Sequence, residues 1–147
     1  MSIWTHAAGI IRVDSFGQFK DITENLKNLF KTCDFDSPIK DWDDCNVPKG
    51  SEGSLQVVVW KNPDVECMAS HTISIFGDLR DYGIEDKEKF ITWWKAILKR
   101  CAHVPGGCGI RNAVINVMFE DGGSYILDDK GHQYKIGGKN ETIFNYL

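Results

Sequence analysis

Residues 87–101 read KEKFITWWKAILKRC, and this stretch decides the fold. Its apolar side chains fall on one face of a helix with 3.6 residues per turn, and its charged side chains fall on the other. The apolar positions are Phe90, Trp93, Trp94, Ile97, Leu98 and Cys101. Asp86 stands at the expected N-cap, and Pro105 followed by two glycines prevents the helix from continuing. We therefore predict an amphipathic helix over residues 87–101 that covers a sheet.

Strand patterns flank this helix on both sides. Residues 69–76 precede it, and a polar loop is expected over residues 77–83. Residues 55–60 alternate in the same way, and Asn62-Pro63-Asp64 supplies turn chemistry, so these two strands are predicted to pair as an antiparallel hairpin. After the helix, strands are predicted over residues 113–120, 124–127 and 132–136, joined by turns that contain glycine.

The first part of the chain supplies one more strand and one more helix. Residues 4–13 alternate with period two, and residues 16–31 carry an apolar stripe at helical spacing. Ser15 and Gln18 have the spacing of a capping box, which predicts that this helix begins close to residue 16.

The resulting order is strand, helix, strand, strand, helix, strand. This order predicts one α+β domain over residues 1–147, a ferredoxin-like split βαβ sheet with both helices on one face, extended by a C-terminal β-meander. The apolar tail at 143–147 is expected to dock on this body. Residues 32–54 depart from the pattern, because they contain five aspartates and two prolines, and we predict a long acidic irregular loop there.

The composition narrows the classes of function. The chain has 147 residues and a formal net charge of −4, which disfavours direct binding to nucleic acid or to anionic membrane. Its first residues lack a signal-peptide pattern, and we expect a cytoplasmic protein that does not enter the membrane. The five cysteines are an odd number at irregular spacing and predict reduced thiols.

Two groups of residues suggest chemistry without specifying it. Cys101, His103 and Cys108 follow one another closely and would bind zinc if a fourth ligand came near, but the spacing favours a buried Cys101 with two incidental neighbours. His71 and His6 are candidates for acid–base catalysis only if their strands bring them together; the commoner alternative is a plain surface histidine. We assign no catalytic residue, metal ligand or cofactor.

The sheet face turned away from the helices is the more informative surface. Strand alternation directs a mixture of aromatic, aliphatic and polar side chains onto this face, and such a mixture is typical of protein interfaces. Alternatively, and equally well, the C-terminal tail (143–147) or the long acidic loop (32–54) would cover this sheet face within the chain itself. The loop 50–54 is either a flexible turn or an anion-binding nest. The candidate binding residues on this face and loop are Trp4, His6, Arg12, Ser51, Glu52, Gln56, Trp60, Asp78 and Arg80.

Four segments carry a resemblance. They read SIWTH (2–6), GIIRVD (9–14), GSEGSLQ (50–56) and IFGDLRD (75–81). Together they resemble a group of small, mostly uncharacterised proteins encoded by bacteriophages and prophages. The resemblance implies an accessory protein that acts by binding, for example by blocking a host defence component or by capturing a signalling nucleotide.

Three hypotheses of function follow. The first is a non-enzymatic phage accessory protein, expected to be a homodimer, that binds and inhibits or modulates a host macromolecule through the open sheet face and the acidic loop. The second is a nucleotide-binding sponge that uses Arg12, Arg80 and the 50–54 loop, with Trp4 or Trp60 stacked on the base. The third is a phosphoesterase or nuclease that depends on His6 and His71.

Overall fold

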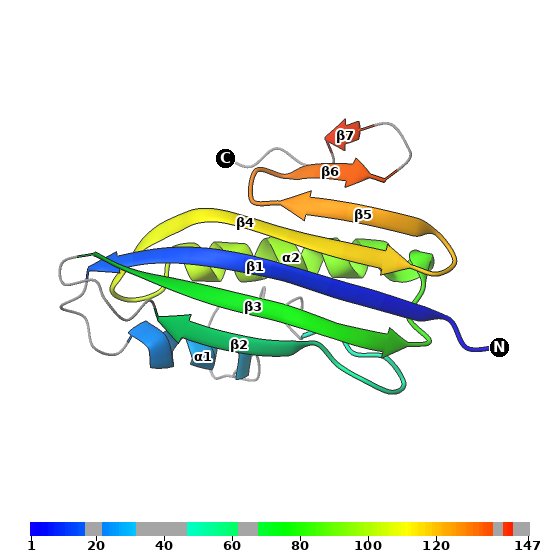
Figure 1. Cartoon of the computed structure of the whole chain (residues 1–147), viewed down its shortest axis with the longest axis horizontal. Helices are drawn as coiled ribbons and strands as arrows, with labels where there is room; N and C mark the ends of the chain where they lie inside the picture. The colour runs from blue at the N-terminus through cyan, green and yellow to red at the C-terminus, as the bar shows by residue number, and fades with distance from the viewer. Residues whose placement is uncertain (17–21, 32–46, 62–67, 137–139, 143–147) are drawn as a thin grey trace.

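A single antiparallel sheet organises the chain. The structure, a computed structural model, describes residues 1–16, 22–31, 47–61, 68–136 and 140–142. The strands of the sheet are β1 (Trp4–Phe16), β2 (Gln56–Lys61), β3 (Met68–Arg80), β4 (Gly107–Phe119), β5 (Gly123–Asp128), β6 (His132–Lys135) and β7 (Asn140–Thr142). They lie in the order β2-β3-β1-β4-β5-β6-β7, and each neighbouring pair is antiparallel (Figure 1). The long strands β1, β3 and β4 form the centre.

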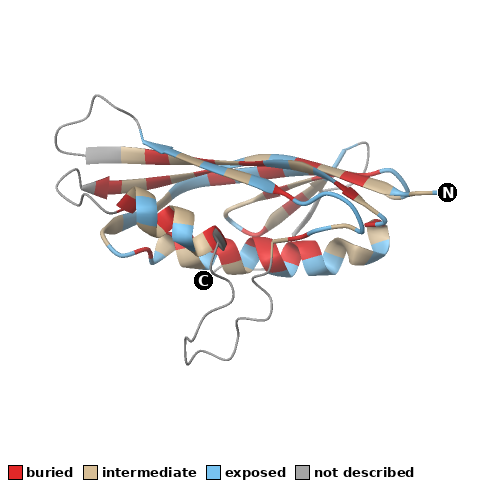
Figure 2. Cartoon of the chain, turned by 90° about the horizontal axis from the view of Figure 1, so that it is seen from below, coloured by how far each residue is buried: buried red, intermediate tan, exposed pale blue. Residues whose placement is uncertain are grey.

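Both described α-helices lie on one side of this sheet. Helix α1 (Ile22–Lys31) contacts β2, and α2 (Lys87–Ala102), which follows the short 3-10 turn η2 (Ile84–Asp86), contacts β4 and β1 (Figure 2). The predicted α+β class and the helix over residues 87–101 are therefore confirmed. The opposite side of the sheet carries no described helix.

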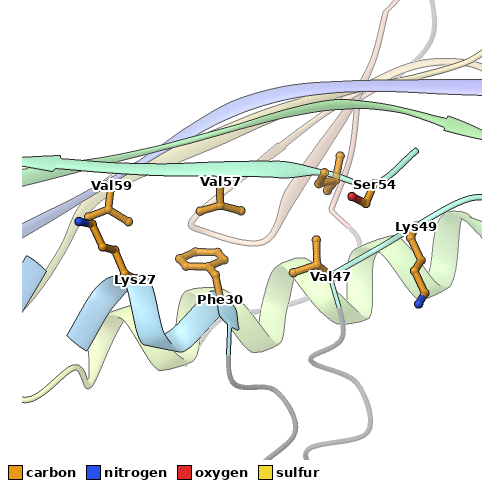
Figure 3. A pocket seen from close by; sticks show the side chains of 8 residues that line it. Lys27, Phe30, Val47, Lys49, Ser54, Val57 and Val59 are labelled. Atoms are coloured by element: carbon orange, nitrogen blue, oxygen red, sulfur yellow. The ribbon is translucent and has the colours of Figure 1, made fainter. Parts of the chain in front are cut away.

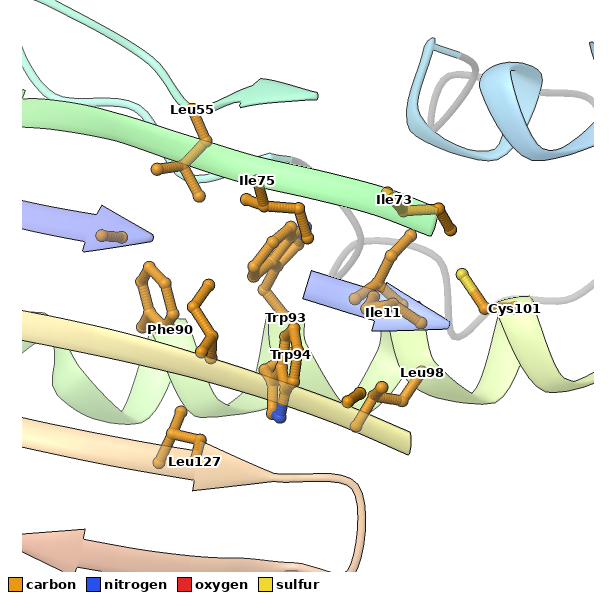
Figure 4. Packing of buried hydrophobic residues seen from close by; sticks show 14 of the residues in the cluster. Ile11, Leu55, Ile73, Ile75, Phe90, Trp93, Trp94, Leu98, Cys101 and Leu127 are labelled. Carbon is orange, nitrogen blue, oxygen red and sulfur yellow. The ribbon is translucent and has the colours of Figure 1, made fainter. Parts of the chain in front are cut away.

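The core lies between α2 and the inner face of the sheet. The apolar stripe of α2 packs against inward side chains of β1, β3 and β4 (Figure 4). Phe90, Trp93, Trp94, Ile97, Ile11, Ile73, Ile75 and Ile115 are at most 2% exposed. The Trp94 indole N–H also donates to the Asp128 carbonyl at 3.1 Å, which satisfies its polar atom and ties α2 to the end of β5. The core-facing half of the predicted alternation is confirmed.

Strand β3 is longer than predicted. Residues 77–80 belong to the strand, so the polar loop expected at 77–83 is wrong over this range. The alternation in fact continues, because Leu79 is fully buried on the core face while Asp78 and Arg80 stand on the other. The turn comes at Asp81, which has a positive φ of 55°.

Strand β1 also continues past its predicted end. It runs to Phe16, so Ser15 is a buried strand residue and does not cap a helix. Its hydroxyl lies 3.4 Å from Nδ1 of His71 on the neighbouring strand. The predicted capping partner Gln18 lies outside the described residues, and described helix begins at Ile22.

The second half of the chain shows two further differences. Strand β4 begins at Gly107, six positions before the predicted start at Ala113. The predicted meander is confirmed in β5 and β6, and β7 was not predicted. The acidic stretch 32–46 and the tail 143–147 lie outside the described residues, so their predicted roles stay predictions.

Candidate binding surface

The outer face of the sheet exposes large apolar side chains in register. Ile10, Val58, Trp60, Phe76, Val114 and Met118 are each 40–49% exposed, although all of them belong to regular strands. The strand register places Val58, Ser74, Ile10 and Val114 in one row across four strands. These residues and their outward neighbours on β1 to β6 are called the open face below. Among the described residues, no helix or strand covers it.

Arg12 and Trp60 lie at one end of the open face. The register aligns Trp60 with Thr72, and Thr72 with Arg12, so the two side chains are two strands apart at the same level. This corresponds to a separation of about 10 Å. The Arg12 guanidinium donates through Nη2 to the Ser70 hydroxyl at 3.1 Å. A cation and a half-exposed tryptophan therefore form one edge of the apolar surface.

A histidine between two carboxylates marks the other end. His6 Nδ1 lies 2.6 Å from Asp78 Oδ1, and His6 Nε2 lies 3.3 Å from Glu120 Oε1. The Asp78 hydrogen bond is the largest cause and raises the pKa of His6 above its ordinary value; burial opposes it, and the hydrogen bond with Glu120 adds to the rise. We call these three residues the acidic end; even with His6 protonated, their net charge is negative.

A shallow hollow connects the acidic end to the apolar centre. Its volume is about 360 Å³, and its lining includes Ala8, Phe76, Asn116 and Met118 as well as His6 and Asp78. The hollow exists because Ala8 is the small residue of its row, between Phe76 on β3 and Asn116 on β4. The open face therefore combines projecting side chains with a depression that could receive one.

The 50–54 loop is hydrogen-bonded to the end of β3 through part of its backbone. The Ser51 N–H donates to the Arg80 carbonyl at 2.9 Å, and the Arg80 N–H donates to the Glu52 carbonyl at 3.0 Å. Gly53 has a φ of +79°, and a Cβ there would overlap the Asp78 carbonyl oxygen. Both observations show a loop tied to the end of β3 by its own backbone, with the Ser51 N–H unavailable to an anion.

The Arg80 side chain is also engaged within the chain. Its Nη1 lies 2.7 Å from Glu52 Oε1, and its Nε donates to the Ser2 hydroxyl at 2.9 Å. Trp4 is the β1 partner of Arg80 at this corner of the sheet. Arg12 lies eight positions further along β1, a separation of about 26 Å.

The candidate residues thus divide into two groups. Trp4, His6, Ser51, Glu52, Asp78 and Arg80 gather at one end, and Arg12 and Trp60 lie at the other. Gln56 is exposed between them, in register with Phe76. No single small ligand spans both groups, so the nucleotide site imagined around Arg12, Arg80 and the loop does not form as one pocket.

His6 and His71 do not form a common site. Asp78, which pairs with His6, is seven positions from His71 along β3, and an odd separation in a strand puts the two on opposite faces. His71 is 2% exposed, with Nε2 3.0 Å from the Thr23 hydroxyl. Burial, aided by the Lys61 charge, lowers the pKa of His71. It is a neutral histidine of the core whose ring nitrogens face hydroxyl groups.

The cysteine–histidine cluster likewise gives no metal site among the described residues. Cys101 is fully buried, and burial raises the pKa of its thiol to about 12, whereas Cys108 is exposed. No group of three or more His, Cys, Asp or Glu side chains there is arranged to hold a metal ion. Cys45 and Cys67 lie outside the described residues.

A second hollow lies on the helix side, at the edge of the sheet. Its volume is about 320 Å³, and its walls include Phe30 of α1 with Val57 and Val59 of β2 (Figure 3). Lys27 and Lys49 stand at its rim, and Lys27 Nζ is 3.3 Å from Glu24 Oε1. The chain enters and leaves the undescribed stretch 32–46 beside this hollow, so it forms no complete site within the described residues.

Glu120 is the member of the acidic end that sequence reasoning missed. It follows β4, and its N–H donates to the Trp4 carbonyl at 3.1 Å, which brings its carboxylate beside His6. The residue types alone give no signal for this contact. The register of β1 against β4, in which Ile11 pairs with Ala113 on the core face, would have found it.

With the geometry of this surface established, comparison of the chain with protein-family models, curated proteins and solved structures finds no match.

Neither described helix combines the length and the apolar character that crossing a lipid bilayer would require.

Proposed function

We propose that this chain is a non-enzymatic binding protein that docks its open face on a host macromolecule and inhibits or modulates it. The observation that carries the proposal is the set of six large apolar side chains exposed on one sheet face. Exposed apolar surface of this extent is costly in water, and soluble proteins keep it mainly where a partner covers it. Trp60 and Arg12 belong to the residue types that dominate interface energies.

The two histidines considered for catalysis, His6 and His71, favour binding over catalysis. Both ring nitrogens of His6 face carboxylates, and His71 is buried among hydroxyls on the far side of the sheet. A general base needs one nitrogen free to reach a substrate proton. Neither histidine meets that requirement in this arrangement.

The biological setting and the finer fold belong to the same proposal. The phage accessory role rests on the resembling segments, and action in the host bacterial cytoplasm follows from that role. We also assign the first four strands and both helices to a ferredoxin-like split βαβ unit. The order β2-β3-β1-β4 supports this assignment, while β5, β6 and β7 make the complete sheet wider than that unit.

The test is a quantitative pull-down from host extract with immobilised full-length chain. Trp60→Ala and Arg12→Glu are compared with wild type, and Thr92→Ala on the exposed side of α2 serves as the control. We expect both open-face variants to lose the captured protein while the control retains it, with all four chains folded by circular dichroism. Equal capture by all four chains would contradict the proposal.

A further inference from the structure

The open face has a relief that repeats with opposite sense in two adjacent rows. In one row Phe76 projects from β3 beside Ala8 on β1; in the next row Ser74 lies on β3 beside Ile10 on β1. Phe76 is 47% exposed and Ile10 is 40% exposed. Along each of these two strands, a large residue is therefore followed at the next outward position by a small one.

We propose that, before the host macromolecule binds, the open face is covered by a second copy of this chain, packed face to face about a two-fold axis that runs across the strands. The host macromolecule then has to displace this copy, because both bind the same surface. The proposal rests on the proposed role of the open face as a protein-binding surface. A two-fold axis of this orientation lays each strand over its own copy and reverses its direction. It exchanges the two rows just described, if it passes between them.

The exchange matches large residues with small ones. Phe76 comes to lie over Ser74 of the partner subunit, and Ile10 comes to lie over Ala8 of the partner subunit. The hollow of about 360 Å³ around Ala8 then receives the Ile10 side chain of the other copy. Because the contact is two-fold, each such match occurs twice. Interdigitation of this kind is how two sheets pack at a separation of about 10 Å.

The charges at the two ends fit the same axis. Arg12 lies one row beyond Ile10, and His6 lies one row beyond Ala8, at the opposite end. The rotation therefore brings Arg12 over His6 of the partner subunit, whose ring is flanked by the carboxylates of its acidic end. The side chains of Asp78 and Glu120 are 65% and 47% exposed. An arginine and a carboxylate that extend from opposite sheets can bridge a gap of about 10 Å.

The alternative axis is disfavoured by the same groups. A two-fold axis parallel to the strands would lay each acidic end over its own copy and would leave Arg12 without an opposite charge. Like charges brought together at an interface are strongly unfavourable. The charge pattern of the open face therefore selects the axis that crosses the strands.

The size of the face is sufficient for a stable dimer. The open face extends over six neighbouring strands of the sheet, β2-β3-β1-β4-β5-β6. At a spacing of about 4.8 Å these strands span about 29 Å. The rows from Asp78 to Thr72, with their side chains, extend about 26 Å along the strands. The product, about 750 Å², is an upper limit, because β2, β5 and β6 are shorter than the three central strands. It falls within the range of roughly 600–1,000 Å² that each partner buries in interfaces of standard size.

Sedimentation velocity of the full-length chain over a concentration series tests the proposal. We expect wild type to sediment as a dimer, and Arg12→Glu and Asp78→Lys each to weaken the dimer by about 100-fold or more. The double variant, Arg12→Glu with Asp78→Lys, restores complementary charges and is expected to recover the dimer. Thr92→Ala, on the helix side, should match wild type, and circular dichroism checks that every variant is folded.

Three results would overturn the proposal: a monomeric wild type, single variants that remain dimeric, or a double variant that stays monomeric when both single variants are monomeric. These results are separate from the pull-down. A monomer that still captures a host protein through Trp60 removes the second copy but keeps the proposed function. If the double variant recovers the dimer, but Trp60→Ala and Arg12→Glu capture the host protein as wild type does, the second copy is kept and the proposed function is removed.

Discussion

Replacement of Trp60 by alanine separates the binding role of the open face from its role in stability. About 49% of Trp60 is exposed, and a tryptophan side chain offers up to about 250 Å², so about 120 Å² remains available to a partner. At about 25 cal/mol per Å², its burial contributes about 3 kcal/mol to binding. We therefore expect Trp60→Ala to weaken the complex by about 150-fold.

The cost to the folded chain is much smaller. Trp60 lies near the end of the edge strand β2, and its one cross-strand neighbour is Thr72. Cross-strand pairs contribute up to about 1 kcal/mol, which corresponds to a fall of about 2–4 °C in Tm for a chain of this size. Val57→Ala, on the core side of the same strand, is the matched control: it should lower Tm by a similar amount and leave binding unchanged.

Biolayer interferometry against the captured partner and differential scanning calorimetry measure these two quantities. The expected pattern is a large loss of affinity for Trp60→Ala only. If Trp60→Ala binds like wild type, or if Val57→Ala loses as much affinity, the open face is not the contact surface.

The remaining predictions concern charge and backbone. Asp78→Asn removes the main cause of the raised pKa of His6, so the His6 pKa in an NMR titration should fall towards about 6.5. In wild type the His6 contribution to stability is present below about pH 6.5 and is lost as the pH rises through the folded pKa; an unchanged His6 titration would contradict this. His71 affects the pH dependence of stability in the opposite direction. Because its pKa is lowered in the folded chain, the unfolded chain binds more protons, and stability falls as the pH drops below about 6.5. His71→Gln should remove this loss from the pH dependence of urea midpoints, and an unaltered slope would exclude it. Gly53→Ala should destabilise the chain by about 1–2 kcal/mol or more, because φ is positive there and a Cβ meets the backbone of β3; an unchanged midpoint would show a loose loop.

Sequence patterns predict the centre of this fold better than the ends of its strands. The helical spacing of Trp93, Trp94 and Ile97 identifies α2 because a single face of one element determines it. The end of β3 was missed because Asp78 and Arg80 resemble loop residues. Leu79 between them keeps the strand alternation, and only the buried environment that it enters decides between strand and loop.

The binding surface was predictable in outline but not in its grouping. Alternation alone assigns Arg12 and Trp60 to the face away from the helices, and the register adds that both are aligned with Thr72. Alternation does not predict that the Arg80 side chain pairs with Glu52 and donates a hydrogen bond to Ser2, because those contacts join segments far apart in the chain. Electrostatic pairs of this kind depend on tertiary register, which a single sequence does not contain.

Hydroxyl-radical footprinting shows whether a partner covers the open face, because Trp60, Phe76 and Met118 are oxidisable reporters on it. We predict that all three lose reactivity when the chain is concentrated or its captured partner is added, while side chains on the exposed side of α2 do not. Unchanged reactivity of the three reporters under both conditions would contradict it.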